Sequence, residues 1–272
     1  MLSDKQVWSK TFHMVCSASR CIYIVQTILQ RREELRKAGN APFVAQASKR
    51  PIFVWEPVPD LCTPDEQENF FAANAVVDVV SPNHMELGMM FDQPSWTEES
   101  QEGQTLVRRI TDSGIGSAGN GLLVIRAGKD GSYAYSKTCK IWLPAYHQPD
   151  ASGATPVVDP TGAGNSFLGA LAQGMVTTGR EPFQVIQSVL SQSENWKRGL
   201  DSWGSFQHYP MALICATVAA GFVVEQIGVP QIDKGNGEEL WNQSEFTERV
   251  RLYTQRLFRT LEESPQRHLL TN

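Results

Sequence analysis

The chain has 272 residues, of which 41% are hydrophobic and 19% are charged, and its formal net charge is −5. The composition is typical of a globular protein, and the length suffices for one large α/β domain or two small ones. The negative charge provides no global basic field, which argues against nucleic acid or an anionic membrane as a general partner.

The first half of the chain alternates expected strands with expected helices. Strands are predicted at residues 11–16, 51–55, 75–80 and 121–126. Helices are predicted at residues 17–37, 63–73 and 95–111. Thr63–Glu66 and Ser95–Glu98 have the pattern of capping boxes, so we expect each of them to start its helix.

The second half continues the alternation with more irregular stretches. A hairpin-type turn at 128–131 leads into strands at 132–135 and 139–143, and a polar loop precedes a short buried strand at Val157-Val158. Helices are predicted after this strand and at residues 181–191, 211–227 and 244–263, the last of them mostly exposed. Residues 193–209, rich in Trp, Ser and Gly, are interpreted as an inserted loop.

Alternating strands and helices imply a mainly parallel sheet with helices on both faces, here as a single α/β domain over residues 1–272. In such sheets ligands bind at the carboxyl ends of the strands. Asn83 with Glu86, the turn Gly128–Gly131, and Gly162–Asn165 all fall at such ends. These three places are therefore the candidate site.

The stretch Val157–Phe167 is interpreted as strand, small-residue turn and helix start. Gly162, Ala163 and Gly164 allow a tight turn and a close approach of a ligand to the backbone. Free N–H groups at a helix start, together with the helix dipole, can bind an anion. An ordinary strand-to-helix turn explains the same residues, so the alternative stays open at this point.

Two further residue types bear on site chemistry and location. The five histidines are dispersed without ligand spacing, which predicts no zinc site. The five cysteines are odd in number and form no Cys-x-x-Cys pair, which favours reduced thiols in a cytoplasmic protein. The longest apolar run, residues 211–224, is too short for a membrane span and is expected to be a buried helix.

The motifs occur in an order that resembles the C-terminal part of the PfkB (ribokinase-like) carbohydrate kinases. The Trp-Glu-Pro-Val-Pro segment at 55–59 and the Ser-Pro-Asn-His segment at 81–84 resemble the fungal "maintenance of killer" kinase-like branch. The resemblance covers about residues 11–230 and rests on Asn83, Glu86, Gly128, Gly131, the Asp159–Asn165 run and the Cys215–Ala220 run.

The resemblance implies a function and a set of roles. The chain would be an ATP-dependent sugar kinase with ATP and Mg²⁺ as cofactors, and the backbone at Gly162, Ala163 and Gly164 would form an anion hole for the transferred phosphoryl group. Glu86, with Asn83, would organise Mg²⁺ through its waters. The Gly128–Gly131 turn would lie near the nucleotide and Ala216 near the adenine, although a plain hairpin and plain core packing explain these two equally well.

The chain departs from the family pattern at Asn165, where the family has an aspartate that takes the proton from the sugar hydroxyl. A neutral amide is not a base, so this position predicts impaired phosphoryl transfer. Arg126 stands where the family usually has a small hydroxyl residue. It could contact a nucleotide phosphate or simply be exposed at a strand end.

The family's sugar-binding strands and lid have no counterpart in this sequence, which is expected to be incomplete at its N-terminus. The sheet should then expose one edge, through which the chain could associate with itself or with a protein partner. A sugar kinase and a nucleotide-binding pseudokinase with a regulatory role both remain open. A Rossmann oxidoreductase is disfavoured because no Gly-x-Gly-x-x-Gly opens an early βαβ unit.

Overall fold

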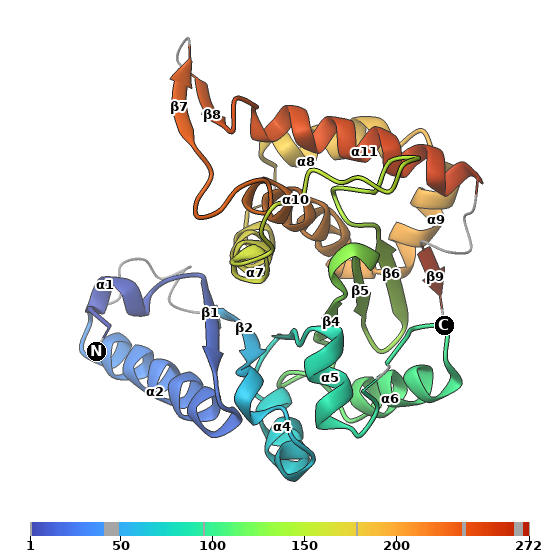
Figure 1. Cartoon of the computed structure of the whole chain (residues 1–272). Helices are drawn as coiled ribbons and strands as arrows, with labels where there is room; N and C mark the ends of the chain where they lie inside the picture. Colours follow the sequence, from blue (N-terminus) through green and yellow to red (C-terminus); the bar gives the residue numbers. More distant parts are fainter. Residues whose placement is uncertain are drawn as a thin grey trace. The chain divides into compact units, whose positions relative to one another are not determined.

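The computed structural model describes residues 2–40, 49–94, 96–177, 179–235, 238–263 and 269–271. The chain divides into two compact units (Figure 1). The first comprises Met1–Ile125 and Tyr135–Lys137, and the second comprises Arg126–Ala134 and Thr138–Asn272. The expected single domain over residues 1–272 stays a prediction.

The first unit is built on a parallel sheet with the strand order β1-β2-β3-β4. Its strands are β1 (Thr11–Cys16), β2 (Ile52–Pro57), β3 (Val79–Val80) and β4 (Leu122–Arg126). Met14 lies opposite Trp55, Trp55 opposite Val80, and Val80 opposite Leu123. All four strands were predicted, and their parallel pairing confirms the expected sheet type for this unit.

Strand β3 is shorter than the predicted span 75–80. The N–H of Ala75 bonds to Phe71 O at 3.3 Å, and the N–H of Val76 bonds to Ala73 O at 3.0 Å. These bonds finish the preceding helix, so the backbone becomes extended only near Val79. Among the described strands β1 pairs only with β2, which leaves β1 at an edge of the sheet.

The helices of the first unit are α1 (Asp4–Val7), α2 (Ala18–Lys37), α4 (Gln67–Asn74), α5 (His84–Met90) and α6 (Gln101–Asp112), with short 3-10 turns at Pro59–Leu61 and Pro64–Glu66. The first predicted capping box is wrong, and the second begins at Ser95, which lies outside the described residues. Thr63 makes no capping bond because Pro64 opens a 3-10 turn first. Helix α6 is capped by Ser100, whose Oγ accepts from the Gly103 N–H at 2.9 Å, and it starts later than expected.

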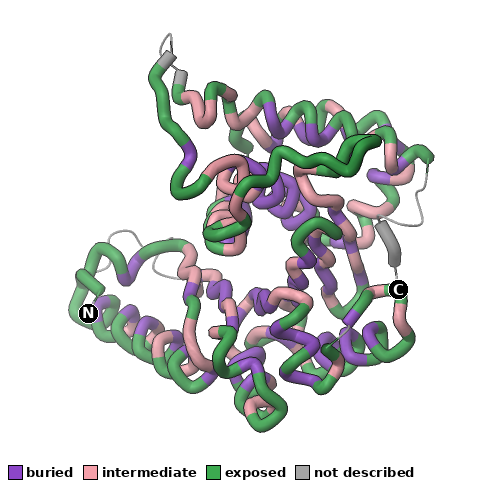
Figure 2. The backbone as a smooth tube through the Cα atoms, in the orientation of Figure 1, coloured by how far each residue is buried: buried purple, intermediate pink, exposed green. Residues whose placement is uncertain are grey.

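The second unit consists mainly of helices. They are α7 (Ala163–Gly174), α8 (Glu181–Leu190), α9 (Glu194–Ser202), α10 (His208–Val223) and α11 (Phe246–Glu263), with 3-10 turns at Gly128–Asp130 and Gly204–Phe206. Helix α10 forms the core and packs mainly on α7 and also on α11. It is almost entirely buried (Figure 2), as its apolar run predicts.

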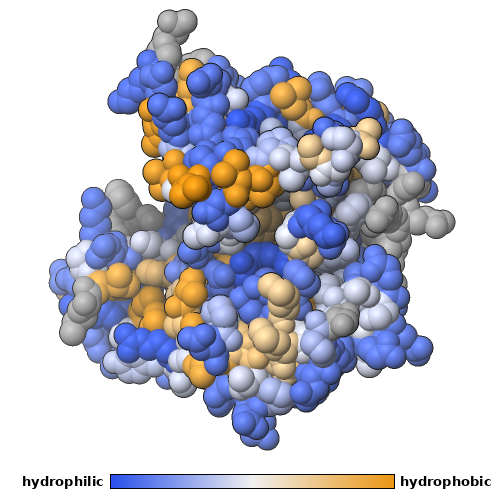
Figure 3. Space-filling model, viewed as in Figure 1, coloured by the Kyte–Doolittle hydropathy of each residue, from blue (hydrophilic) through white to orange (hydrophobic). Residues whose placement is uncertain are grey.

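The remaining strands are β5 (Ser132–Tyr135), β6 (Cys139–Leu143) and β9 (Leu269–Thr271), together with a hairpin of β7 (Ile232–Gly235) and β8 (Glu238–Trp241). Strand β6 pairs antiparallel with β9, with Cys139 opposite Thr271. The hairpin and β9 were not predicted. The segment that leads into β7 exposes Ile227 and Val229, and an apolar patch is visible beneath β7 in Figure 3.

Three predictions for the second unit are wrong. Val157 and Val158 form no buried strand: Val158 is 61% exposed, and its N–H bonds to Val224 O at 2.7 Å. Residues 193–209 are not a loop but contain α9 and the start of α10, because Trp196 and Trp203 are buried. Helix α11 is not mostly exposed, since one face buries Val250, Tyr253, Leu257 and Leu261. No helix within the described ranges has the length and apolar character needed to cross a membrane.

Candidate functional site

The start of α7 has the geometry of an anion hole. Gly162, the N-cap residue, has a φ of +83°, which a residue with a side chain rarely adopts, and it supplies no side-chain cap. The Ala163 N–H is used by Pro160 O at 3.1 Å, which closes the turn. The N–H groups of Gly164 and Asn165 belong to the first helical turn and have no acceptor within the helix. They can therefore donate to an anion, and the helix dipole favours this.

Asp159 shapes the turn that leads into this hole. Its Oδ1 accepts the Thr161 N–H at 2.9 Å, and the hydrogen bonds from the Thr161 backbone and side chain lower the pKa of the Asp159 carboxyl. The N–H groups of Val158 and Asp159 both bond to Val224 O, at 2.7 and 3.2 Å, and so attach the turn to the end of α10. This engagement fits a structural role for Asp159 better than the role of a base.

Asn165 occupies the third position of α7 and is exposed to solvent. The next residue, Ser166, donates its hydroxyl to Ala219 O at 3.2 Å and thereby holds α7 against α10. The amide of Asn165 can donate or accept a hydrogen bond, but it cannot take a proton near neutral pH. The structure thus places Asn165 in the first turn of α7, next to the N–H groups described above, without a proton acceptor in its side chain.

A cavity of about 490 Å³ adjoins this helix. Its lining includes Ser166 and Ala170 of α7, Ala219 of α10 and Trp241 of β8, and charged groups come from Arg180 and Glu239. A volume of this order is within the range of small-molecule sites. The second unit therefore offers space for a small ligand next to Ser166, the residue that follows Asn165.

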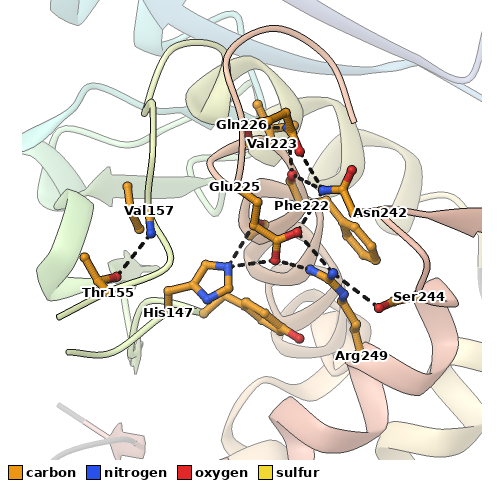
Figure 4. Close-up of polar contacts among 12 residues, drawn as sticks. His147, Thr155, Val157, Phe222, Val223, Glu225, Gln226, Asn242, Ser244 and Arg249 are labelled. Atoms are coloured by element: carbon orange, nitrogen blue, oxygen red, sulfur yellow. Dashed lines mark hydrogen bonds and ion pairs between the residues drawn. The ribbon is translucent and has the colours of Figure 1, made fainter. Parts of the chain in front are cut away.

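A polar cluster joins the loop before α7, through His147, to the end of α10 and to α11 (Figure 4). Arg249 of α11 forms an ion pair with Glu225 just after α10, with Nη2 3.1 Å from Oε2 and Nη1 bonded to Oε1. His147 Nε2 lies 3.0 Å from Glu225 Oε1 and 3.2 Å from Gly221 O. Asn242 Nδ2 donates to Phe222 O at 3.0 Å and to Glu225 Oε2 at 2.8 Å.

Glu225 is the centre of this cluster and stays ionised. Burial raises the pKa of its carboxyl, but the hydrogen bonds from Arg249 and Asn242 and the nearby charges of Arg249 and His147 outweigh burial and lower the pKa. The Arg249 guanidinium also lies over the Phe222 ring, 3.8 Å from the ring centre. Sequence reasoning did not find this cluster, because its members lie far apart in the chain and no local motif marks them.

In the first unit, Asn83 and Glu86 form a reciprocal cap of α5. Glu86 is only 4% exposed, and its two oxygens accept from the Asn83 N–H and from Asn83 Nδ2, each at 2.7 Å. Asn83 Oδ1 in turn accepts the Glu86 N–H at 2.8 Å. The sequence pattern Asn-x-x-Glu is thus a capping box, and it holds the Glu86 carboxylate in a fixed orientation.

The described residues contain no group of three or more His, Cys, Asp or Glu side chains that could hold a metal. One carboxylate with an amide neighbour fits Mg²⁺ that keeps most of its waters and takes other ligands from phosphates. Glu86 therefore fits the water-mediated role expected of it, and a site made only of protein ligands does not fit.

The two glycines of the turn after β4 have different surroundings, although the same role near the nucleotide was expected of both. Gly131, with a φ of +88°, lies so close to β6 that an added Cβ would be 2.0 Å from Leu143 O. Gly128, with a φ of +56°, faces open space. The closed turn, in which the Ala127 N–H bonds to Gly131 O at 2.8 Å, supports the plain hairpin explanation for Gly131.

The last two candidates differ in their surroundings. Arg126 ends β4 and is partly buried. Ala216 is 0% exposed within α10, so in the second unit it is part of the core. Gly221, on the same helix, is covered by Tyr146, whose ring an added Cβ would meet at 2.5 Å. Nucleotide contacts of Arg126 and Ala216 remain predictions.

A family model for pfkB family carbohydrate kinases matches residues 46–229, which is more than half of the chain. The chain belongs to the pfkB family. The match includes the Asn83–Glu86 cap, the Gly128–Gly131 turn and the start of α7, and it confirms the family expected from these motifs.

Two fungal proteins are similar to this pfkB family chain. Protein MAK32 of Saccharomyces cerevisiae is 30% identical over 251 residues, which are 89% of this chain and 56% of that protein. An uncharacterized protein of Schizosaccharomyces pombe is 26% identical over 268 residues, 93% of this chain and 62% of that protein. The chain thus spans less than two thirds of the length of these relatives, and its similarity to both is consistent with the expected fungal branch.

Two solved ribokinases share the fold. A ribokinase from Giardia lamblia has a TM-score of 0.53 at 18% identity, over 92% of this chain and 60% of its own. A ribokinase from Arabidopsis thaliana, solved with ribose and ATP, has a TM-score of 0.52 at 18% identity, over 93% and 60%. These likenesses confirm the predicted ribokinase-like fold with its mainly parallel sheet.

Proposed function

We propose that this pfkB family chain binds ATP with Mg²⁺ and is a carbohydrate kinase whose transfer of the phosphoryl group to a sugar hydroxyl is slow. The observation that carries the proposal is the start of α7, where an uncapped helix end offers N–H groups beside Asn165. Such a site can stabilise a phosphoryl group but supplies no base. Membership of the family and the Arabidopsis ribokinase solved with ribose and ATP support the choice of ligands.

The proposed roles follow from the contacts described above. The N–H groups of Gly164 and Asn165 hold phosphate oxygens, and the Gly162 turn leaves room for them. Glu86, fixed by Asn83, accepts hydrogen bonds from the waters of Mg²⁺. Bound Mg²⁺ would neutralise charge on the phosphates. Asn165 orients the sugar hydroxyl by a hydrogen bond, but the proton has to leave to solvent or to another acceptor.

Exposed Asn165 also favours a second candidate, a pseudokinase that binds the nucleotide and acts as a regulatory protein. In that case bound ATP stabilises the fold without turnover. A protein partner or a second copy could pair with the edge of β1, whose outer side carries no described strand. Five free thiols in the described residues support a reducing, cytoplasmic location as part of the proposal.

The test compares the purified chain with Asn165→Asp in two measurements, calorimetry with ATP and Mg²⁺ and release of ADP over a panel of sugars. A restored base should raise ADP release by about 10²–10⁴-fold. Binding of ATP with no ADP release from either protein identifies the pseudokinase. Absence of ATP binding by the folded wild-type chain refutes both candidates.

Asn195→Asp is the matched control. Asn195 also lies in the first turn of a helix, α9, and the substitution adds the same charge there. We expect it to leave ADP release unchanged. If Asn195→Asp raised ADP release as much as Asn165→Asp, the gain would come from charge alone, and the assignment of Asn165 to the base position would be wrong.

A further inference from the structure

Two cysteines meet where β1 ends and α2 begins. Ser17 is the N-cap of α2, with its Oγ 3.2 Å from the Arg20 N, so Cys16 lies just before the cap and Cys21 lies in the first full turn. Residues at these two positions face each other across a helix start, as in a hydrophobic staple. In this chain both positions carry thiols, and each thiol shifts the pKa of the other.

The two thiols differ in access and in backbone support. Cys16 is partly exposed, whereas Cys21 is 0% exposed. Cys16 O accepts from Trp55 Nε1 at 2.9 Å and from the Val58 N–H at 3.3 Å, so the end of β1 is held in place. A reagent from solvent therefore reaches Cys16 first, because Cys21 is fully buried.

The surroundings also separate the acidities of the two thiols. The hydrogen bond donated by Cys21 lowers the pKa of Cys16, burial opposes this, and the charge of Arg20 lowers it further. The same hydrogen bond, together with burial, raises the pKa of Cys21. Cys16 is thus the more acidic thiol of the pair, and the thiolate is the form that reacts with peroxides.

We propose that Cys16 and Cys21 form a reversible peroxide-sensitive dithiol, in which Cys16 is oxidised first and Cys21 then closes a disulfide. This site lies in the first unit and uses none of the residues assigned to the proposed nucleotide site. Its reagent is a hydroperoxide, with hydrogen peroxide as the simplest member.

The reaction balances in two steps. The Cys16 thiolate attacks one oxygen of hydrogen peroxide, the O–O bond breaks, and hydroxide leaves and takes up a proton, so that sulfenic acid and one water form. The Cys21 sulfur then loses its proton and attacks the Cys16 sulfur, an S–S bond forms, the S–O bond breaks, and a second water leaves. Two thiols lose two electrons, and the peroxide gains them.

The pair is suited to a direct readout by mass spectrometry. Trypsin cleaves after Lys10, Arg20 and Arg31, so Cys16 and Cys21 fall on adjacent but separate peptides. A disulfide between them joins these two peptides into one species that a reductant splits. We expect this species after treatment of the folded chain with hydrogen peroxide, and about tenfold less of it when the chain is oxidised in denaturant.

Variants test the order of events. In Cys21→Ser the sulfenic acid on Cys16 should persist and be trapped by dimedone, because no thiol remains to displace it. In Cys16→Ser neither the joined peptides nor dimedone labelling of Cys21 should form. Cys62→Ser is the control, since Cys62 is a buried thiol elsewhere in the unit, and it should leave the joined peptides unchanged.

Three outcomes would overturn the proposal. They are equal yields of the joined peptides from folded and denatured chain, dimedone labelling of Cys21 rather than Cys16, and stable oxidation of Cys16 in the wild-type chain without the joined peptides. The first and third of these outcomes are measured on the wild-type chain alone, so the test does not depend on the folding of any variant.

Discussion

Asn83 and Glu86 hold each other in place at the start of α5: the Asn83 N–H bonds to Glu86 Oε2 at 2.7 Å, and the Glu86 N–H bonds to Asn83 Oδ1 at 2.8 Å. The pair is a complete capping box, and it leaves a buried carboxylate with fixed orientation. One arrangement can therefore serve both the stability of α5 and a water-mediated contact with Mg²⁺.

Substitutions at Glu86 should separate these two roles. Glu86→Gln keeps a side chain that can cap, so the free energy of unfolding should change by less than about 1 kcal/mol. Affinity for ATP with Mg²⁺ should fall by about 10–100-fold, because the waters of the metal lose a charged acceptor. Glu86→Ala should also lose about 0.5–2 kcal/mol of stability with the cap.

Denaturant unfolding and calorimetry measure the two effects at Glu86. Glu102→Gln is a suitable control, since Glu102 lies in the first turn of α6, is exposed and makes no capping box. Unchanged ATP affinity in Glu86→Gln would show that Glu86 acts only as a cap.

The two glycines of the turn after β4 should respond differently to alanine. Gly131→Ala places a Cβ 2.0 Å from Leu143 O at a φ of +88°, so we expect a loss of about 3 kcal/mol or more in the free energy of unfolding. Gly128→Ala meets open space at a φ of +56° and should cost only about 1–2 kcal/mol. Urea unfolding of both variants checks this, and equal losses would contradict the close approach of Gly131 to β6.

The Glu225 cluster should make stability depend on acidity. Its folded pKa lies below the ordinary value, so ionised Glu225 stabilises the fold above the unfolded pKa, and this contribution disappears as the pH falls through the folded pKa. Glu225→Gln should therefore be less stable than the wild type at pH 7, by about 1–3 kcal/mol. The difference should shrink below a pH of about 4.

Unfolding curves of the wild type and Glu225→Gln between pH 7 and a pH of about 4 test the direction of this pH dependence. Glu248→Gln on α11 is a control, because Glu248 is more exposed than Glu225 and pairs only with its neighbour Arg251 among the ion pairs of the described residues. If the difference in the free energy of unfolding between the wild type and Glu225→Gln stayed constant with pH, the ion pair of Glu225 would not stabilise the fold.

Cys16 should be the most reactive thiol toward alkylation at neutral pH. The pKa of Cys62 is raised to about 12 by burial and the charge of Glu86, and burial also raises the pKa of Cys215 to about 12. Cys21→Ala removes the hydrogen bond that lowers the Cys16 pKa and should slow alkylation of Cys16 by about three- to tenfold, whereas Cys21→Ser should retain most of the rate. Faster labelling of Cys62 than of Cys16 would contradict these acidities.

Local chemistry made much of the first unit predictable. Strands such as β1 and β4 are short apolar runs between clear helix signals, and Ser17 marks the start of α2. The turn that we propose as an anion hole is equally local, because Gly162 supplies the positive φ and the following residues supply the N–H groups within a few positions. The motif alone was also enough to align Asn165 with the aspartate of the family pattern.

Other features depend on residues that are distant in the chain. Val157 and Val158 have the side chains of a strand, yet in the described second unit Val158 bonds to Val224 at the end of α10 and stays exposed. Residues 193–209 have a loop-like composition, but burial of Trp196 and Trp203 stabilises helix there. In both cases tertiary packing outweighs the local preference.

The sequence by itself determined the family, the alternation of strands and helices, and the absence of a carboxylate at Asn165, because each is encoded in contiguous residues. Only the tertiary structure decided that Asn83 and Glu86 cap one another fully, and that the carbonyl of Leu143 leaves no room for a side chain at Gly131. It also decided that His147, Glu225 and Arg249 form one cluster. Those relations arise from distances between segments, and residue order alone does not fix such distances.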